Sequence, residues 1–323
     1  MSDTTPTRLD RALALEAVRV TEAAAIAAAK LAGRGDEKAA DQVAVDAMRT
    51  ALNLLAIDGR IVIGEGERDE APMLYIGEKV GTGDGPRVDI ALDPLEGTTL
   101  TAKAMANALA VMAFAPEGGM LHAPDTYMDK IAIGPGYPEG VVDLDADAGE
   151  NALNLARAKG VDISEITACV LDRPRHAEII AGLRKVGAKV QLITDGDVAG
   201  VIHTTEPDTG IDIYLGQGGA PEGVLACAAL RAVGGQFQGR LVFRNDDERA
   251  RAERIGLTDF DRKYTLREIV RHEAIFVATG VTRGAMLDGV RYERGYVTTH
   301  SLVMSSSSGT VRNIRMRRPV QGG

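Results

Sequence analysis

The stretch Val88-Asp-Ile-Ala-Leu-Asp-Pro-Leu-Glu-Gly-Thr-Thr99 places an apolar strand directly before a run of polar residues. Pro94 fixes its own φ angle and favours an extended conformation at Asp93, while Gly97 permits close approach of the backbone to a ligand. We therefore expect a turn that presents two carboxylates and a hydroxyl, followed by the start of a helix. Together with bare N–H groups, these suit a divalent cation that holds a phosphate. The alternative is a turn in which Asp and Thr side chains only bond nearby backbone.

Composition and charge narrow the possible functions. The chain has 323 residues, 45% of them hydrophobic and 26% charged, which suits two domains or one large α/β body. A net charge of −9 argues against a nucleic-acid or anionic-membrane surface, and the absence of Trp argues against base stacking. Cys169 and Cys227 sit in apolar runs, so we expect buried thiols in a reducing compartment. We expect neither a signal peptide nor a membrane span, which leaves the cytoplasm as the default location.

The first part of the chain alternates helical and strand patterns. Apolar spacing over residues 9–31 predicts a helix, and Asp36 is expected to cap a second helix. On the second helix Asp41 lies in line with the buried stripe, although the helix dipole alone favours an acid near a helix start. The apolar strand 61–63 leads into a segment with four acids: Glu65, Glu67, Asp69 and Glu70. The flanking glycines and the apolar strand favour an interior sheet edge over a merely solvated loop.

The middle of the chain predicts a change of domain. Strands are expected at 109–114 and 130–133, with Tyr127 in the loop between them. Residues 134–149 are rich in Gly, Pro and Asp, which are typical of a domain transition. We therefore expect an N-terminal α+β domain over residues 1–145 and a C-terminal α/β domain over residues 146–323. The fold class as a whole is predicted to be α/β.

The second half reads as repeated strand–loop–helix units. Strands are expected at 166–171, 189–193 and 211–215, and a helix is expected after each. This alternation predicts a largely parallel sheet with right-handed crossovers. The loops lie at the carboxyl ends of the strands, where open α/β sheets bind ligands. The charged run 244–254 is interpreted as a solvated helix face, and strands are expected at 274–279, 297–304 and 311–317.

Three of these loops carry groups suited to a sugar phosphate: 172–176, 194–197 and the glycine-rich 216–223, whose N–H groups could face a ligand. Arg173 and Arg175 flank a proline, which spreads two guanidinium groups for phosphate recognition. The alternative is a surface pair, which is slightly unfavourable near a helix start. Asp195 and Asp197 are suited to accept sugar hydroxyls, but Asp197 equally suits a helix N-cap.

Five acids lie at the ends of expected strands or helices: Asp41, Glu65, Asp93, Glu96 and Glu222. Carboxylates that gather in one place repel one another, so a cluster implies cations. Oxygen-only ligands favour Mg²⁺ or Mn²⁺ over Zn²⁺. Dipole pairing at a helix start is a sufficient alternative for Glu222. The five histidines lack metal-ligand spacing and are interpreted as structural.

Longer stretches carry a family resemblance. They are Gly64-Glu-Gly-Glu-Arg-Asp-Glu-Ala-Pro-Met73, Asp172-Arg-Pro-Arg-His176, Thr194-Asp-Gly-Asp197 and Gly218-Gly-Ala-Pro-Glu-Gly223. These stretches resemble the bacterial class II fructose-1,6-bisphosphatases, and Asp93-Pro-Leu-Glu-Gly-Thr98 looks like the metal-binding signature of the lithium-sensitive phosphatase superfamily. The similarity runs in the same order from about Leu13 to Arg317. Arg173 departs from the pattern, because relatives often carry Lys there.

The resemblance implies a role for each matching residue. The implied metal ligands are Asp41, Glu65, Asp93, Leu95, Glu96 and Glu222. Asp69 and Thr98 match the pair that activates the attacking water. The implied substrate contacts are Glu96, Gly97, Thr98, Tyr127, Arg173, Pro174, Arg175, Asp195, Gly196, Asp197 and Gly219. The family also implies a layered α/β sugar-phosphatase fold and a homo-oligomer (dimer or tetramer).

The implied activity is metal-dependent hydrolysis of the 1-phosphate of fructose 1,6-bisphosphate, with Mn²⁺ or Mg²⁺, in gluconeogenesis or a carbon-fixation cycle. Two alternatives share this chemistry: a dual enzyme that also accepts sedoheptulose 1,7-bisphosphate, and an inositol monophosphatase. Two arginines suited to a distal phosphate favour a bisphosphate. A non-catalytic sugar-phosphate sensor ranks lowest, because the water-activating pair and all five acids are present.

Overall fold

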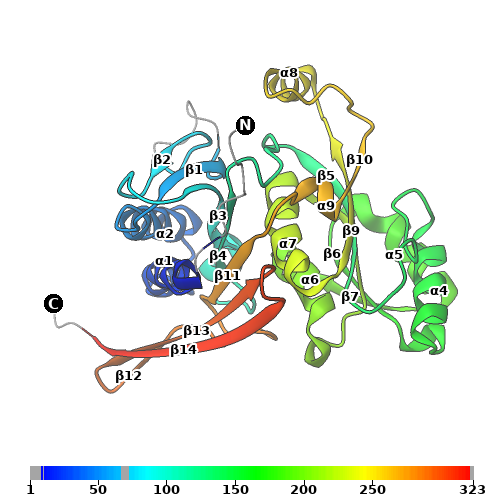
Figure 1. Cartoon of the computed structure of the whole chain (residues 1–323). Coiled ribbons are helices and arrows are strands. Elements are labelled where there is room, and N and C mark those ends of the chain that lie inside the picture. Colours follow the sequence, from blue (N-terminus) through cyan, green and yellow to red (C-terminus); the bar gives the residue numbers. More distant parts are fainter. Residues whose placement is uncertain (1–8, 10, 67–72, 321–323) are drawn as a thin grey trace. The chain divides into compact units, whose positions relative to one another are not determined.

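The computed structural model describes residues 9, 11–66 and 73–320 (Figure 1). The chain divides into two compact units. Unit 1 comprises Met1–Leu121 and Val270–Gly323, and unit 2 comprises His122–Ile269. In the described residues, no helix combines the length and apolarity that crossing a membrane requires.

Unit 1 is a sheet packed against helices. Its strands are β1 (Asp58–Ile63), β2 (Lys79–Val80), β3 (Arg87–Glu96), β4 (Leu109–Pro116), β11 (Ile275–Gly280), β12 (Arg291–Glu293), β13 (Tyr296–Ser305) and β14 (Thr310–Pro319). They run in the order β12-β13-β11-β4-β3-β1-β2, with β14 paired to β13. Among the described strands of this sheet only β1 and β3 pair in parallel. The helices are α1 (Arg11–Ala29), α2 (Glu37–Leu52) and α3 (Thr98–Ala102).

The helices α1 and α2 form where the apolar spacing predicted them. Asp36 caps α2, because its side chain accepts a hydrogen bond from the Ala39 N–H at 2.9 Å. The buried face of α2 includes Val45, Met48 and Leu52, and it joins a core with residues of α1 and the sheet. Removal of this apolar surface from water stabilises the unit and fixes the position of α2, which carries Asp41.

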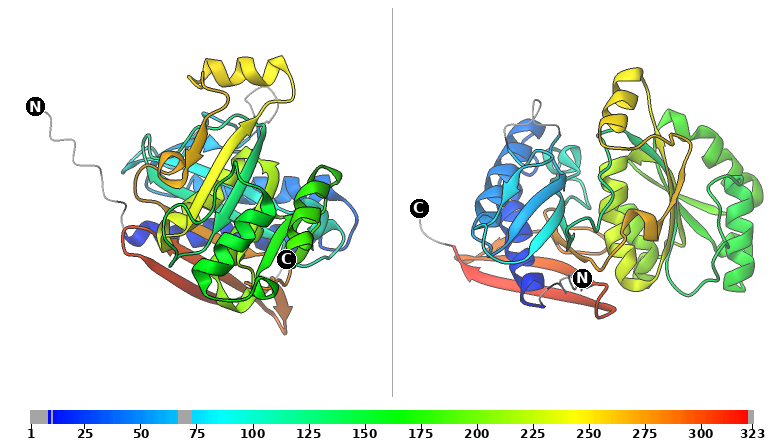
Figure 2. Two further views of the ribbon diagram at one scale, coloured as in Figure 1. Left: turned by 90° about the vertical axis from the view of Figure 1, so that its right-hand side faces the viewer. Right: turned by 45° about the horizontal axis from the view of Figure 1, so that its top comes forward.

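The C-terminal strands form a long hairpin. The pairing of β13 with β14 extends from Tyr296 opposite Pro319 to Ser305 opposite Thr310, and both views in Figure 2 show the resulting ribbon in red and orange. This arrangement confirms the two final strands expected from the sequence. The antiparallel pairing of β11 with β4 and β13 ties this C-terminal segment into the sheet of unit 1.

Unit 2 is a sheet with helices on both faces (Figure 1). Its strands are β5 (Tyr127–Ile133), β6 (Thr167–Leu171), β7 (Lys189–Ile193), β8 (Ile213–Gly219), β9 (Gln236–Val242) and β10 (Lys263–Thr265). Its helices are α4 (Ala148–Lys159), α5 (Ala177–Val186), α6 (Asp197–Ile202), α7 (Ala220–Val233), α8 (Asp246–Arg254) and α9 (Leu266–Ile269), with the 3₁₀ turns η1 (Ile163–Glu165), η2 (Pro174–His176), η3 (His203–Thr205) and η4 (Pro207–Thr209). The helices α4 and α5 cover one face of this sheet, and α6 and α7 cover the other.

The sheet of unit 2 is mixed, so the expectation of a largely parallel sheet was wrong. The strand order is β10-β9-β5-β8-β6-β7, and the parallel pairs among its described strands are β6–β7 and β6–β8. The pairs β5–β8, β5–β9 and β9–β10 are antiparallel. The strand–helix repeat indicated β6, β7 and β8 correctly, but local patterns carry no information on the direction of strands that pair from far along the chain.

Two predicted loops are strand in the structure. The strand β3 continues through Asp93 to Glu96, with a register shift against β4 that marks a β-bulge in place of the expected turn. The strand β8 continues through the glycines to Gly219, and Tyr127 opposite it begins β5 instead of lying in a loop. Cross-strand pairing overrides the turn preference of Pro and Gly at these sites.

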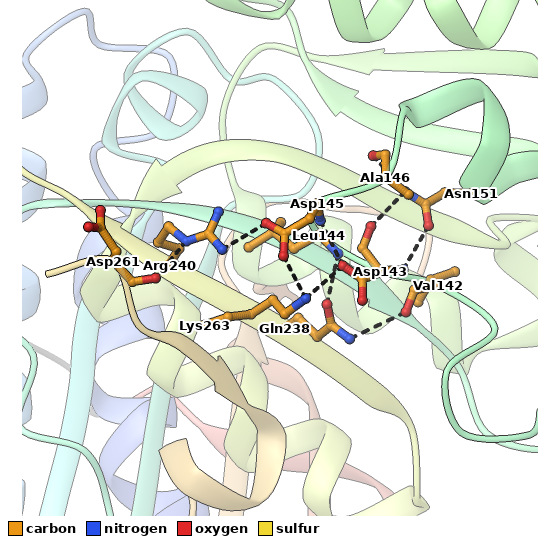
Figure 3. A network of polar contacts seen from close by, with 10 residues as sticks. All are labelled: Val142, Asp143, Leu144, Asp145, Ala146, Asn151, Gln238, Arg240, Asp261 and Lys263. Atoms are coloured by element: carbon orange, nitrogen blue, oxygen red, sulfur yellow. Dashed lines mark hydrogen bonds and ion pairs between the residues drawn. The ribbon is translucent and has the colours of Figure 1, made fainter. Parts of the chain in front are cut away.

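The two units differ from the single transition predicted near residue 145. The Gly-, Pro- and Asp-rich segment is an ordered part of unit 2, held by the network in Figure 3. Lys263 Nζ lies 2.7 Å from carboxylate oxygens of both Asp143 and Asp145, and Arg240 Nη2 also lies 2.7 Å from Asp145. The composition of a tethered surface loop resembles that of a linker, because both avoid regular structure.

Candidate functional site

The bulge at the end of β3 presents two carboxylates. Oxygens of Asp93 and Glu96 lie within 4.8 Å of each other, and Glu96 is buried. Asp93 Oδ1 accepts a hydrogen bond from the Leu95 N–H at 2.9 Å, which orients this carboxylate. Gly97 adopts a left-handed conformation (φ 88°) as the N-cap of α3. A Cβ at Gly97 would lie 2.8 Å from Leu100 Cδ1, so the turn into α3 requires glycine.

Two further acids of unit 1, Glu65 and Asp41, interact electrostatically with this region. Burial and the charges of Asp93 and Asp41 raise the pKa of Glu65 to about 9. Burial also raises the pKa of Asp41. The structure therefore brings together acids from three places in the sequence: α2, the segment after β1, and the end of β3.

The donor chemistry of this cluster fits a hard divalent cation. Its side chains offer carboxylate oxygens, and the charges that act on Glu65 are those of other carboxylates. A bound cation would remove the cost of holding these like charges together. Thr98 is half-buried at the first position of α3, directly after this bulge. Asp69, the expected partner of Thr98, lies outside the described residues.

Unit 2 by itself contains a cluster of positively charged side chains. Arg175 donates to the Gln217 carbonyl oxygen from Nη2 at 2.8 Å, and its guanidinium lies 5.0 Å from the centre of the Tyr127 ring. Arg173 is the N-cap of η2, and its Nη1 donates to the Asp172 carbonyl oxygen at 3.1 Å. Pro174 occupies the first turn of η2, so the proline separates the two arginines as the sequence indicated.

A buried histidine fixes η2 against β8. His176 Nδ1 lies 2.7 Å from the Leu171 carbonyl oxygen, and Nε2 accepts a hydrogen bond from the Gln217 N–H at 2.8 Å. Burial lowers the pKa of His176, which keeps the ring neutral and suits this pair of roles. The histidine therefore has the structural role that was expected of it, and it holds the Arg175 segment next to the strand that carries Gln217.

Sequence reasoning missed Arg244. This residue follows β9, and its guanidinium lies 4.7 Å from the centre of the same Tyr127 ring. Val242 is the register partner of Tyr127 in the antiparallel pairing of β9 with β5, so Arg244 reaches the ring through a strand contact that no local pattern reveals. The only local signal was the i, i+4 spacing of Arg244 and Glu248. That spacing also suits a solvated helix face, which is how the segment was interpreted.

The remaining predicted residues of unit 2 lie at the starts of α6 and α7. Asp197 is 6% exposed, and Lys130 Nζ, itself buried, lies 2.5 Å from its Oδ2. The N-cap of α6 is Gly196 and not Asp197, and Asp195 precedes it half-buried. Asp197 thus has an internal counter-ion, which the sequence did not indicate.

Glu222 lies in the first turn of α7 and folds back over the residue that caps this helix. A Cβ at Gly219 would lie 1.8 Å from Glu222 Oε2, so this close approach requires glycine. The Gly219 carbonyl oxygen also accepts a hydrogen bond from Lys130 Nζ at 2.8 Å. Cys169 and Cys227 are free and buried, as expected from the sequence.

Comparison with known proteins agrees with these features. The family described as bacterial fructose-1,6-bisphosphatase, glpX-encoded, matches residues 11–318. The chain is 47% identical over 319 residues, 94% of either chain, to fructose-1,6-bisphosphatase 1 class 2 of Escherichia coli K12. The class 2 fructose-1,6-bisphosphatases of Escherichia coli O6:H1 and Shigella flexneri show the same 47% identity and the same coverage of 94%. The resemblance inferred from the motifs is confirmed, and the chain belongs to the family of bacterial class 2 fructose-1,6-bisphosphatases.

Proposed function

We propose that this protein hydrolyses the 1-phosphate of fructose 1,6-bisphosphate with the help of divalent cations held by its carboxylates. Family membership gives the substrate class and the reaction, hydrolysis of a phosphoric monoester of a sugar bisphosphate. The observation that carries the metal dependence is the pKa of Glu65, which burial and two neighbouring carboxylates raise to about 9. Such a cluster costs free energy unless cations compensate it.

The proposed cation ligands are the carboxylates of Asp41, Glu65, Asp93, Glu96 and Glu222 with the Leu95 carbonyl oxygen. Asp41, Glu65 and Asp93 are supported by their mutual influence within unit 1. Glu222 and the Leu95 carbonyl enter on the family resemblance alone. Oxygen ligands suit Mg²⁺ or Mn²⁺, and such an ion, when bound, stabilises the negative charge that develops on a reacting phosphate.

The residues of the chain itself move the proton and bind the sugar phosphate. Asp69 and the Thr98 hydroxyl orient the attacking water and take its proton. Gly97 and Thr98 lie beside the acids on the turn into α3, which supports their place at the reacting phosphate. Asp195, Gly196, Asp197 and Gly219 bind the sugar, and the Lys130 contact fixes Asp197 in one position.

The arginines of η2 bind the distal phosphate. Arg175 is preorganised, because the Gln217 carbonyl oxygen and the Tyr127 ring hold its guanidinium. A fixed guanidinium suits the planar, bidentate recognition of phosphate. Energy from this remote contact positions the reacting phosphate, so its loss raises KM. On the resemblance we also propose a cytoplasmic homo-oligomer, a dimer or a tetramer.

The test is phosphate release from fructose 1,6-bisphosphate, sedoheptulose 1,7-bisphosphate and inositol 1-phosphate, each with Mg²⁺, Mn²⁺ or EDTA. We expect turnover of the fructose substrate that EDTA abolishes and added metal restores. Turnover that persists in EDTA would refute the role of the carboxylates. Activity on the inositol ester alone would refute the substrate assignment and leave the metal proposal intact.

A further inference from the structure

We propose that Arg244 is a specificity-determining residue that binds the distal phosphate together with Arg175, and that the buried Glu248 is its positioning residue. The inference rests on the proposed function, because it places the distal phosphate of the substrate at Tyr127 and Arg175. It assigns the ligand chemistry at this point as a phosphate monoester with two negative charges. All of the residues concerned lie in unit 2.

The first observation is that two guanidinium groups share one aromatic ring. Arg175 lies 5.0 Å and Arg244 lies 4.7 Å from the centre of the Tyr127 ring. Each contact is favourable, but the two positive charges repel. Among the described residues, the partners of Arg175 are the uncharged Gln217 carbonyl oxygen and this ring. The charge of Arg175 is therefore not paired with a carboxylate in the described structure.

The second observation is that Glu248 holds Arg244 from one edge. Arg244 Nε donates to Glu248 Oε1 at 2.6 Å, and Nη2 also contacts this oxygen. The Arg244 backbone N–H donates to Oε2 at 2.7 Å, and the Thr126 hydroxyl donates to the same oxygen at 2.9 Å. The Glu248 side chain is 1% exposed, so it is a fixed anchor.

This anchoring leaves the other side of the Arg244 guanidinium for a ligand. No described residue hydrogen-bonds Nη1, and the Arg244 side chain is 51% exposed. Of the two guanidinium groups at Tyr127, Arg244 has a described carboxylate partner, Glu248, whereas the Arg175 guanidinium has no ion-pair partner among the described residues. Fixed guanidinium groups with free N–H donors recognise phosphate oxygens.

A second Glu–Arg–Tyr arrangement in unit 2 provides an internal comparison. Arg262 lies 4.9 Å from the centre of the Tyr264 ring, and its Nη2 lies 2.8 Å from Glu268 Oε1. There the Arg262 guanidinium, which lies on the ring, is balanced by the Glu268 carboxylate. At Tyr127, in contrast, the Arg175 guanidinium has no described carboxylate partner, and this is the feature that points to an anionic ligand.

The experiment compares Arg244→Ala with the matched control Arg262→Ala. KM and kcat are measured on fructose 1,6-bisphosphate and on fructose 1-phosphate, which lacks the distal phosphate. We expect Arg244→Ala to raise KM for the bisphosphate about tenfold or more, as for a lost charge-assisted hydrogen bond, with kcat nearly unchanged. Fructose 1-phosphate should react equally well with both variants. An equal loss on both substrates, or a KM equal to that of Arg262→Ala, would overturn the proposal.

The role of Glu248 and the fold are tested with conservative variants. Arg244→Lys keeps a charge beside Glu248 but lacks the planar fork, so we expect an intermediate rise in KM with an unchanged melting temperature. Glu248→Gln keeps an acceptor for Arg244 and should raise KM less than Glu248→Ala does. A lower melting temperature without any change in KM would assign Glu248 a purely structural role and refute positioning.

A binding measurement separates this inference from the proposed reaction. Calorimetric titration of the metal-free protein with fructose 6-phosphate reports the distal site without catalysis. We expect binding that Arg244→Ala weakens about tenfold or more and Arg262→Ala leaves unchanged. If the wild-type protein binds fructose 6-phosphate but hydrolyses no fructose 1,6-bisphosphate, the reaction fails and the site stands. If Arg244→Ala binds as wild type does, the site fails and the reaction stands.

Discussion

The acidic cluster of unit 1 (Asp41, Glu65, Asp93 and Glu96) and the guanidinium pair of unit 2 (Arg175 and Arg244) are opposite in charge. They also differ in how far neighbouring residues of the protein compensate their charges. The charges that act on Glu65 come from two other carboxylates, Asp93 and Asp41. At Tyr127, by contrast, Glu248 pairs with one of the two guanidinium groups. The Glu65 carboxylate therefore depends more strongly on an external counter-ion. Charge that the fold does not balance indicates where a ligand acts. The amount of unbalanced charge indicates how much the ligand contributes to the stability of the site.

The buried pair of Lys130 and Asp197 is a third case, in which the fold supplies both charges. The contact of 2.5 Å joins a lysine that is 1% exposed to a carboxylate that is 6% exposed. We predict that Lys130→Met lowers the free energy of unfolding by about 3–5 kcal/mol, because it leaves a buried carboxylate without its partner. Urea denaturation measures this loss.

An exposed pair in the same unit is the control for this variant. Lys159 Nζ lies 2.5 Å from Asp212 Oδ1, but the Lys159 side chain is 36% exposed. Lys159→Met should cost no more than about 1 kcal/mol, because solvent screens exposed pairs. Equal losses in the two variants would show that the Lys130 pair is not a buried, fully compensated site, and the comparison with the two clusters would lose its reference.

The acidic cluster should show the opposite response to loss of a charge. Glu65→Gln keeps the shape of the side chain and removes one of the repelling charges. We predict that turnover falls at least about 100-fold, since a metal supplies several kcal/mol of transition-state stabilisation. The metal-free variant should be at least as stable as wild type, because its buried carboxylate no longer has to be kept beside two others.

A paired acid on β3, the strand that carries Asp93, is the control for Glu65. Asp89 is 1% exposed on β3, where its oxygens contact Arg60 Nη2 at 3.4 Å and the Gly118 N–H at 2.7 Å. Asp89→Asn should lower stability and leave turnover within about twofold. Metal-induced rises in melting temperature should persist in Asp89→Asn and vanish in Glu65→Gln. Normal turnover and a normal rise in Glu65→Gln would break the assignment.

Acid unfolding limits the pH range in which the two clusters can be compared. The His203 ring is buried, neither ring nitrogen has a described partner, and burial lowers its pKa from 6.5 to about 4. The unfolded chain takes up this proton below about pH 6.5, whereas the folded chain takes it up only near pH 4. The stabilisation is therefore complete above pH 6.5, and as pH falls toward 4 roughly 3 kcal/mol is lost.

Urea denaturation at several pH values tests this effect. The free energy of unfolding should fall between pH 6.5 and 4 in the wild-type protein, and His203→Leu should fall less steeply. An identical pH dependence in the two proteins would exclude His203 as the cause. Variants of the two clusters should therefore be compared above pH 6.5, where a loss of activity is not caused by unfolding of the protein.

The same contrast explains what the sequence could predict. The strand β7 matched its predicted bounds, and the helix α5 follows β6 as expected, because period and capping are local properties. Asp41, Glu65 and Asp93 influence one another as expected, and this was predictable because the strand and helix ends that carry them can be recognised from local patterns. Arg244 reached Tyr127 through the pairing of β9 with β5, and the C-terminal strands joined β4 through β11. Such contacts depend on strand direction and register between distant segments, which a single sequence does not specify.

Arg175 gives the smallest expected effect and the sharpest test of the guanidinium pair. Arg175→Ala should raise KM for fructose 1,6-bisphosphate about tenfold with little change in kcat, because the lost contact lies away from the reacting phosphate. Its side chain is exposed, so the melting temperature should be nearly unchanged. Arg184→Ala, an exposed arginine in the last turn of α5, removes the same charge and should leave KM unaltered.

Combination with Arg244→Ala then distinguishes one shared ligand from two independent surface charges. If both guanidinium groups bind the same phosphate, removal of the first weakens the grip of the second, and the effects of the single variants should not add. The coupling should also shrink at high salt, because screening affects half-exposed charges more than buried ones. Strict additivity in kcat/KM would mean that the two arginines act separately, and Tyr127 would then be a coincidental neighbour of both. Non-additivity that is seen with the bisphosphate alone would instead show that both guanidinium groups bind a single phosphate, the one that fructose 1-phosphate lacks.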